Sequence, residues 1–200
     1  MSQAGRLPRV ILIVGPTAVG KTSLSIDLAK RLNAEIISAD SRYLYRRMNI
    51  GTAKPSPEEL SGIPHYLIDV AEPDEVWSLA RFLESTYRLT EEIISRGKTS
   101  IIVGGTGQYM RALLEGWQLP EFEPIPQLRR VLGDWSEEIG KKELHHKLSI
   151  IDKDSAEFID FTNVRRTIHA LEVIFSTGER FSTLRRKTEP IFDFWVIGLQ

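Results

Sequence analysis

The stretch Gly15-Pro16-Thr17-Ala18-Val19-Gly20-Lys21-Thr22 fills the pattern G-x-x-x-x-G-K-S/T of a phosphate-binding loop. It follows the unbroken apolar run 10–14, and apolar residues recur at helical spacing over 24–32. Strand, glycine loop and helix thus occur in the order that lets backbone N–H groups and a helix N-terminus converge on phosphate oxygens. Lys21 would reach a terminal phosphate and the Thr22 hydroxyl would bind Mg²⁺, so the sequence predicts a site for a di- or triphosphate.

Further apolar runs predict additional strands of a parallel sheet. We expect these strands at 35–39, 65–70, 99–103 and 192–199, and helices at 78–96 and 108–115. Because the carboxyl ends of parallel strands border the ligand crevice, Asp40 would lie on the same edge as Lys21. Its carboxylate could hold Mg²⁺ through water, act as a general base, or cap the next segment. A second glycine turn at 104–107 would bring more backbone to this edge.

The character of the sequence changes at Gly116. Residues 117–126 form a proline-containing crossover, after which helical spacing predicts helices at 127–139, 141–149 and 164–177. We therefore expect three parts: an α/β core over 1–116, a helical insertion over 117–190, and a strand returning to the core over 191–200. The basic pairs of the insertion, such as Arg129-Arg130, could bind a polynucleotide or form a solvated face.

The composition restricts the classes of function. The chain has 26 basic and 27 acidic side chains, so its net charge gives no global sign of nucleic-acid binding. The absence of cysteine excludes a disulfide framework and a thiolate zinc site. No apolar run approaches the roughly 18 residues of a membrane span, and residues 1–9 lack the apolar segment of a secretory signal. We expect a cytoplasmic protein with no membrane partner.

Taken together in their order, these motifs resemble the tRNA dimethylallyltransferase (tRNA isopentenyltransferase) family. Besides the phosphate loop, the matching segments are 35–41, 48–55, 64–69, 96–98, 103–107 and 170–173. The resemblance covers most of the 200 residues, and family members continue past the position of Gln200 with a C-terminal segment. It implies an α/β fold, namely a P-loop NTPase-like parallel sheet flanked by helices, with an inserted helical lobe.

The resemblance also implies transfer of a dimethylallyl group from dimethylallyl diphosphate to the exocyclic amino nitrogen of the adenosine 3′ of the anticodon in tRNA. Lys21, Asp40 and Thr106 would be catalytic: Lys21 steadies the leaving diphosphate, Asp40 accepts the amine proton and Thr106 contacts the adenosine. The diphosphate would be held by Gly15, Pro16, Thr17, Ala18, Val19, Gly20, Lys21 and Thr22, with Mg²⁺ at Thr22. The anticodon arm would be contacted by Asp40, Ser41, Arg42, Tyr43, Thr106, Arg129, Arg165, Arg166, Thr167, Ile168 and His169. We expect a monomer.

The chain departs from the family pattern at two places. Residues 160–163 read Asp-Phe-Thr-Asn where the family usually has His-Pro-Asn-Asp, and His169 stands where the family usually has arginine. Three other functions remain open at this stage. They are a P-loop kinase of small metabolites that binds ATP, an adenylate isopentenyltransferase that acts on free AMP, and a non-catalytic tRNA-binding fragment.

Overall fold

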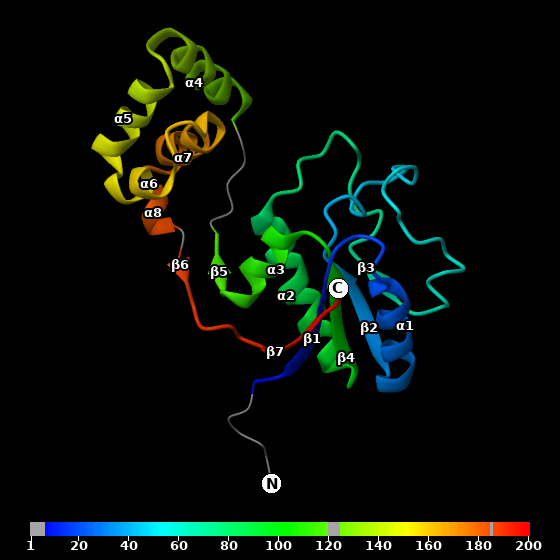
Figure 1. The fold of residues 1–200 in the computed structure, drawn as a ribbon. Helices are drawn as coiled ribbons and strands as arrows, with labels where there is room; N and C mark the ends of the chain where they lie inside the picture. The colour runs from blue at the N-terminus through cyan, green and yellow to red at the C-terminus, as the bar shows by residue number, and fades with distance from the viewer. Residues whose placement is uncertain (1–6, 120–124, 185) are drawn as a thin grey trace. The chain divides into compact units, whose positions relative to one another are not determined.

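The computed structural model describes residues 7–119, 125–184 and 186–200, and the chain divides into two compact units (Figure 1). The first unit comprises residues 1–116 and 188–200, and the second comprises residues 117–187. The first boundary lies at Gly116, where the sequence changes character. The chain returns to the first unit at Thr188, slightly before the predicted position of 191.

The first unit is built on a five-stranded sheet with the order β3-β2-β4-β1-β7, and every neighbouring pair is parallel. Its strands are β1 (Arg9–Val14), β2 (Ala34–Ser38), β3 (His65–Tyr66), β4 (Thr99–Gly104) and β7 (Asp193–Gly198). In register, Val14 at the end of β1 lies beside Gly104 of β4 and Gly198 of β7. The predicted parallel sheet, including the return of the last segment, is confirmed.

Helices cover both faces of this sheet, with α1 (Lys21–Leu32) on one side and α2 (Leu79–Ser95) and α3 (Gly107–Leu114) on the other (Figure 1). Buried Ile26 of α1 packs in one cluster with Ile13 of β1 and Ile101 of β4. The stacked rings of Phe82 and Tyr109, with centroids 3.9 Å apart, join α2 to α3. In the described part of the chain, no helix combines the length and apolar character needed to cross a membrane.

Strand β3 is shorter than the sequence analysis predicted. We expected a strand over 65–70, but only His65–Tyr66 pairs with β2. Leu67 and Asp69 have φ values of 60° and 54°, which belong to the left-handed region and are incompatible with a strand. The segment turns instead toward residues 43–46, where its backbone finds other hydrogen-bond partners.

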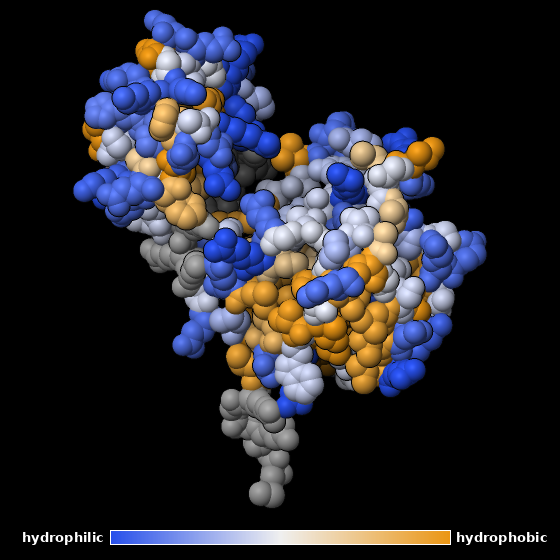
Figure 2. All heavy atoms as spheres, viewed as in Figure 1, coloured by the Kyte–Doolittle hydropathy of each residue, from blue (hydrophilic) through white to orange (hydrophobic). Residues whose placement is uncertain are grey.

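The edge strand β7 carries both apolar and charged side chains. Trp195 and Val196 are about half exposed, and Figure 2 shows hydrophobic residues gathered over this part of the sheet beside α1. The guanidinium carbon of Arg9 lies 4.4 Å from the centroid of the Trp195 ring, and Arg9 Nε lies 3.6 Å from Asp193 Oδ2. Charged groups on an exposed edge oppose uncontrolled pairing with other strands.

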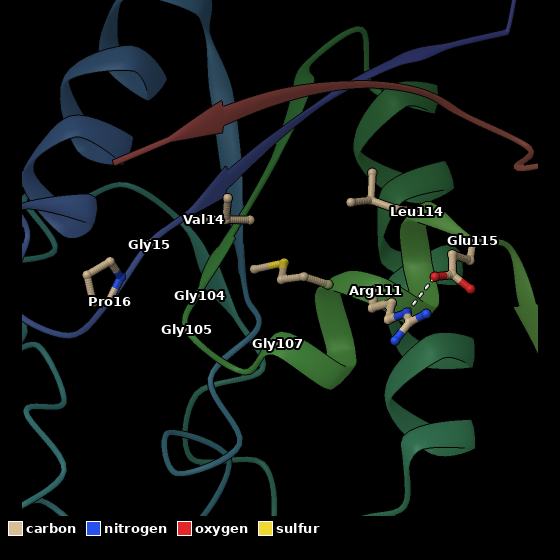
Figure 3. Close-up of a pocket in the computed structure, with 10 residues that line it drawn as sticks. Val14, Gly15, Pro16, Gly104, Gly105, Gly107, Arg111, Leu114 and Glu115 are labelled. Carbon is tan, nitrogen blue, oxygen red and sulfur yellow. Dashed lines mark hydrogen bonds and ion pairs between the residues drawn. The ribbon is translucent and has the colours of Figure 1, made fainter. Parts of the chain in front are cut away.

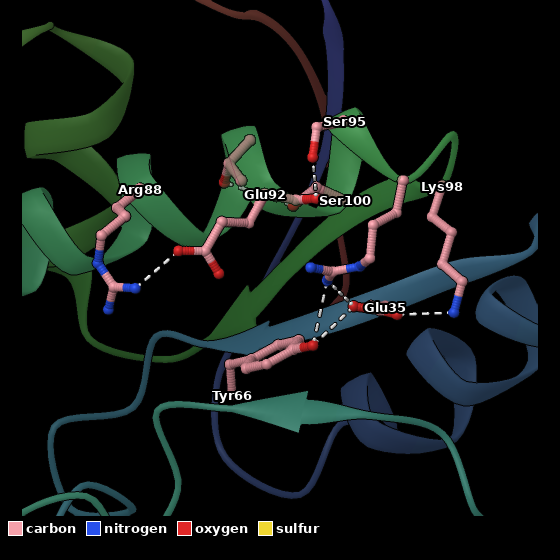
Figure 4. Close-up of polar contacts among 9 residues, drawn as sticks. Glu35, Tyr66, Arg88, Glu92, Ser95, Lys98 and Ser100 are labelled. Carbon is pink, nitrogen blue, oxygen red and sulfur yellow. Dashed lines mark hydrogen bonds and ion pairs between the residues drawn. The ribbon is translucent and has the colours of Figure 1, made fainter.

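A buried carboxylate ties several elements together at the amino end of β2. Glu35 accepts hydrogen bonds from Arg96 Nη2 at 2.6 Å, Lys98 Nζ at 2.7 Å and Tyr66 Oη at 2.8 Å (Figure 4). Burial alone would raise the pKa of Glu35, but the bonds from Lys98, Tyr66 and Arg96 outweigh it and lower that pKa to about 2. The cluster therefore links β2, β3 and the turn from α2 to β4 through one charged group.

The second unit is helical and has its own core. Its elements are α4 (Pro126–Ile139), α5 (Lys141–Ile151), α6 (Lys153–Phe158), α7 (Val164–Thr177), α8 (Phe181–Leu184) and the antiparallel strands β5 (Trp117–Gln118) and β6 (Arg186–Lys187). Buried Leu132, Leu144, Leu148 and Leu171 belong to its core cluster. The three predicted helices are confirmed, whereas α6 and α8 are too short for hydrophobic periodicity to predict.

Polar side chains cap the short helix α6 and connect it to α8. Asp152, which is 1% exposed, accepts hydrogen bonds from the backbone and hydroxyl of both Ser155 and Ser182. His145 Nε2 lies 2.7 Å from the carbonyl oxygen of Ile159, just past the end of α6. His145 is therefore an internal tie and not part of a fully solvated basic face.

A second buried carboxylate holds α4 to α7. Glu172 is fully buried and accepts hydrogen bonds from Arg129 Nη2 at 2.5 Å, Arg129 Nε at 3.1 Å and the backbone N–H of Ile125 at 3.1 Å. An ionised carboxylate is costly to bury unless it is paired and hydrogen-bonded. Arg129 therefore has a structural role within the helical unit.

We expect Glu35→Gln to reduce stability in a pH-dependent way. A carboxylate with a lowered pKa contributes stability above its ordinary pKa of about 4.5, and that contribution is lost as the pH falls toward 2. The variant should lose about 2–3 kcal/mol of unfolding free energy at pH 7 and almost nothing near pH 2. Urea unfolding at a series of pH values measures this difference. Glu143→Gln, which removes an exposed pair with Lys147 away from Glu35, is the matched control; an equal effect in both variants would contradict the assignment.

Arg129→Ala should destabilise the helical unit, because it removes the guanidinium that donates two hydrogen bonds to the buried carboxylate of Glu172. The expected loss is about 3 kcal/mol of unfolding free energy. The adjacent Arg130→Ala provides the control, since Arg130 is exposed on the same helix. Urea unfolding followed by circular dichroism compares the two variants. Indistinguishable midpoints would show that the Arg129–Glu172 pair does not support the fold.

Candidate active site

Residues 15–20 form the turn that connects β1 to α1. The backbone of Gly20 is left-handed, with φ of 89°, and Ala18 also has a positive φ of 66°. Helix α1 begins at Lys21, so the unpaired N–H groups of its first turn border the loop. Lys21 Nζ donates to the carbonyl oxygen of Pro16 at 2.5 Å, which folds the lysine back over its own loop.

A cavity of about 310 Å³ lies between this loop and the carboxyl ends of β2 and β4. Lys21, Thr22, Asp40, Tyr43 and Gly104 are among the residues that line it. The prediction that Asp40 and Lys21 would reach the same edge of the sheet is therefore confirmed. Because all these residues belong to the first unit, the cavity is built without the helical unit.

The ends of β2 and β4 approach each other closely. A β carbon at Gly104 would come within 2.2 Å of the carbonyl oxygen of Ala39, so this position requires glycine. Thr106 adds a second link: its Oγ1 accepts from the backbone N–H of Ser41 at 3.0 Å and donates to Ser41 Oγ at 3.3 Å. The predicted adenosine contact, Thr106, is thus engaged with the segment that follows Asp40.

The carboxylate of Asp40 has one oxygen engaged locally. Oδ1 accepts a hydrogen bond from the backbone N–H of Arg42 at 3.0 Å, and the carbonyl oxygen of Asp40 accepts from the N–H of Tyr43 at 3.1 Å. This is the capping role that the sequence left open. In the described residues nothing donates to Oδ2, so this oxygen can accept a proton or a hydrogen bond from a ligand.

The donors in this cavity suit Mg²⁺ bound together with a phosphate ligand. Mg²⁺ keeps several waters and takes one or two carboxylates plus substrate phosphate oxygens. The Thr22 hydroxyl and the Asp40 carboxylate line the same cavity and supply such oxygens. Across the described ranges, no group of three His, Asp or Glu side chains could hold a metal without a ligand. The site therefore fits a metal that binds with a diphosphate.

Tyr43 and His65 complete the cavity wall. Tyr43 Oη donates to the carbonyl oxygen of Ala53 at 2.5 Å. Burial, followed by the negative charges of Asp40 and Glu59, raises the pKa of Tyr43, so the phenol stays protonated.

The sequence favours a structural role for His65, because a single histidine with no neighbouring partner gives little signal of catalysis, and it does not show that His65 lines the cavity. Its Nδ1 lies 2.8 Å from the carbonyl oxygen of Ile63. Burial lowers the pKa of His65, so the ring is neutral and Nδ1 is the donor. Its Nε2 is buried, and in the described part of the chain it has no hydrogen-bond partner.

A second cavity, of about 630 Å³, borders the two glycine turns (Figure 3). Its wall combines the backbone of both turns with the side chains of Val14, Met110 and Leu114. Arg111 and Glu115 at its rim pair with each other across one helical turn, Nε to Oε1, at 2.5 Å. Gly104 lines both cavities, so the apolar surface lies next to the phosphate loop.

The residues predicted to contact tRNA differ in their accessibility on α7. Arg165, Arg166 and His169 are exposed. Thr167 is only 1% exposed and its hydroxyl donates to the carbonyl oxygen of Asn163 at 3.3 Å, while Ile168 packs against the core of the unit. Thr167 therefore lies in the interior of the helical unit. This follows from helical periodicity, which directs residues spaced three or four positions apart toward the core.

Comparison with known proteins provides the family. The model of the family described as IPP transferase matches residues 43–200. The tRNA dimethylallyltransferase of Herpetosiphon aurantiacus is 48% identical over 193 residues, or 96% of this chain and 61% of that protein. A relative with the same name from Bacillus mycoides is 46% identical over the same shares of the two chains.

Solved structures give the same result. The tRNA isopentenylpyrophosphate transferase of Bacillus halodurans is 42% identical with a TM-score of 0.59, covering 95% of this chain and 59% of that one. A eukaryotic dimethylallyltransferase described as acting on tRNA is 30% identical with a TM-score of 0.77, covering 96% and 48%. The chain thus spans about 61% of the length of the curated relatives it matches. It belongs to the IPP transferase family.

Proposed function

We propose that this chain carries the reaction site of a cytoplasmic, monomeric tRNA dimethylallyltransferase. The reaction transfers a dimethylallyl group from dimethylallyl diphosphate to the exocyclic amino nitrogen of the adenosine 3′ of the anticodon. The observation that carries this proposal is that a phosphate loop with Lys21 and Thr22 shares one cavity with the carboxylate of Asp40. The names of the relatives support the same chemistry.

The phosphate loop suits the leaving group. When the allylic C–O bond breaks, positive charge develops on the allyl carbon and negative charge on the departing diphosphate. The Lys21 ammonium and the N–H groups at the start of α1 stabilise that anion, provided that Lys21 Nζ exchanges the Pro16 carbonyl for a phosphate oxygen. Mg²⁺ bound at Thr22 would neutralise further charge on the diphosphate. The apolar wall of Val14, Met110 and Leu114 offers packing for a short alkyl chain.

Asp40 suits the acceptor. The exocyclic amine of adenosine is a weak nucleophile because its lone pair is delocalised into the purine ring. As the new C–N bond forms, the amine proton passes to Asp40, whose Oδ2 accepts nothing from the described residues. Thr106 supports this segment through Ser41, and a direct contact with the adenosine would require its hydroxyl to change partner.

The acceptor must be presented as an unstacked base. A nucleotide whose amine reacts inside a cavity has to leave its base stack, as in other enzymes that act on bases. Exposed arginines of the helical unit, Arg165 and Arg166, would bind phosphates of the anticodon arm, and exposed Arg42 would do so beside the cavity. Arg129 is less available for this role because it pairs with Glu172.

Mass spectrometry of an anticodon stem-loop with adenosine at the 3′ position tests the reaction directly. After incubation with dimethylallyl diphosphate and Mg²⁺, we expect the mass of one dimethylallyl group on that adenosine. Asp40→Asn should lower the rate about 100-fold or more while changing the affinity for either substrate by less than about threefold, because it acts in the transition state. Product formation by Asp40→Asn at the normal rate would contradict the proposed base.

Lys21→Ala should remove measurable binding of dimethylallyl diphosphate but leave the affinity for the stem-loop within about threefold, since its charge is directed at phosphate. Isothermal titration with each ligand separates the two effects. Arg166→Ala is the converse control, because it should weaken the stem-loop and not the diphosphate. Equal losses of both ligands in both variants would contradict two separate sites.

The same assays distinguish the other functions. Tight Mg²⁺-dependent binding of ATP that dimethylallyl diphosphate does not displace would favour a small-molecule kinase. Prenylation of AMP without prenylation of the stem-loop would favour an adenylate isopentenyltransferase. Stem-loop binding that is unaffected by Asp40→Ala and is never followed by turnover would favour a non-catalytic RNA-binding protein.

A further inference from the structure

Lys54 has no role in the proposed reaction, although it lies in a loop whose residues Ala53 and Pro55 line the 310 Å³ cavity. Its side chain is only 4% exposed. The ammonium donates to the carbonyl oxygen of Tyr45 at 2.6 Å and to Asp69 Oδ1 at 2.7 Å. A lysine ammonium is strongly hydrated, so placing one here is costly unless it makes specific hydrogen bonds. The burial of Lys54 therefore indicates a specific structural role, unlike that of a lysine on the solvated surface.

The ammonium joins two segments that lie outside helices and strands, one containing Tyr45 and the other containing Asp69. Ala53, next to Lys54, has φ of 55°, and Asp69 has φ of 54°, which are uncommon for residues other than glycine. Such conformations persist only when surrounding contacts enforce them. The backbone N–H of Asp69 also donates to the carbonyl oxygen of Tyr43, at 2.9 Å, beside the Lys54 link. Lys54 thus holds segment 43–55 against segment 67–71.

The connection reaches the cavity through Ala53. The carbonyl oxygen of Ala53 accepts the hydrogen bond of Tyr43 Oη at 2.5 Å. Both residues line the 310 Å³ cavity, as does Asp40, which lies three positions before Tyr43 in the chain. A displacement of Ala53 would therefore move the carbonyl oxygen that accepts the hydrogen bond of Tyr43 Oη and so orients the Tyr43 ring beside Asp40. In contrast, among the described residues Lys54 forms hydrogen bonds with Tyr45 and Asp69 and none with the phosphate loop at 15–22.

We propose that Lys54 is a positioning residue for the acceptor nucleotide. It fixes the Ala53 carbonyl, which orients Tyr43 next to Asp40, and so sets the affinity for the acceptor rather than for the diphosphate. The part of this proposal that concerns ligands rests on the proposed function. The part that concerns the order of segment 41–55 rests on the hydrogen bonds alone.

Lys54→Met tests this role, because methionine keeps the apolar stem and removes the ammonium. Lys98→Met is the matched control, since Lys98 also pairs with a carboxylate, Glu35, at 2.7 Å but lies at the opposite end of β2. Asp69→Asn is the milder second variant, because Asp69 is about half exposed and asparagine keeps an acceptor oxygen for Lys54. Tyr43→Phe removes only the hydroxyl at the end of the proposed path.

Three measurements apply to each variant: amide hydrogen exchange of segment 41–55, titration with dimethylallyl diphosphate and Mg²⁺, and fluorescence anisotropy of a labelled anticodon stem-loop. Lys54→Met should raise exchange in 41–55 about tenfold, the loss expected for hydrogen bonds of a charged group. It should weaken stem-loop binding about tenfold and leave diphosphate affinity within about twofold. Asp69→Asn should show the same pattern more weakly, and Tyr43→Phe should weaken only the stem-loop. Lys98→Met should lower the melting temperature without this pattern.

The outcomes are distinct. Lys54→Met that behaves like Lys98→Met, or that loosens 41–55 with no change in stem-loop affinity, would overturn the positioning role. A wild-type chain that binds neither ligand would count against the proposed function instead. In that case, local loosening in Lys54→Met alone upholds the ordering role, and unchanged exchange overturns it.

Discussion

The close approach of β4 to β2 is the constraint on which the site depends. Gly104 leaves no room for a β carbon against the Ala39 carbonyl, so the ends of the two strands lie as near as backbones allow. Because β1 pairs with β4 in parallel register, the phosphate loop that follows Val14 emerges beside them. Three loops are thereby brought to one edge. This arrangement is what brings the Lys21 ammonium and the Asp40 carboxylate into the same cavity.

Sequence patterns that span only a few neighbouring residues predicted the structure well. The phosphate loop and the apolar runs of β1, β2 and β4 are patterns within a few residues, and each lies close to its predicted place. The prediction for strand β3 was too long for a physical reason. Residues 67–70 look like a strand because three of the four side chains are apolar, but Leu67 and Asp69 have left-handed backbones and the segment hydrogen-bonds to residues 43–46. Pattern alone does not contain those contacts.

Charged residues illustrate the same limit at the candidate site. Sequence shows where arginines and lysines cluster but not which carboxylate each one meets. Arg129, expected at an RNA surface, lies against buried Glu172, and Lys54, which no motif assigned a task, ties two segments of the cavity wall. Both pairs join residues at least 15 positions apart, beyond the spacing at which helical periodicity relates charges. A basic residue therefore becomes a candidate ligand contact only after its internal partners are known.

The division of the chain has a consequence for how substrates can bind. The residues that line the 310 Å³ cavity all belong to the first unit, so the geometry offered to a diphosphate is set by the sheet and its loops. The exposed arginines of α7 belong to the second unit, whose core is separate. A small phosphate ligand can therefore be bound by residues of the first unit alone. In the proposed function, the exposed arginines of the second unit serve the polynucleotide acceptor and leave the small substrate unaffected.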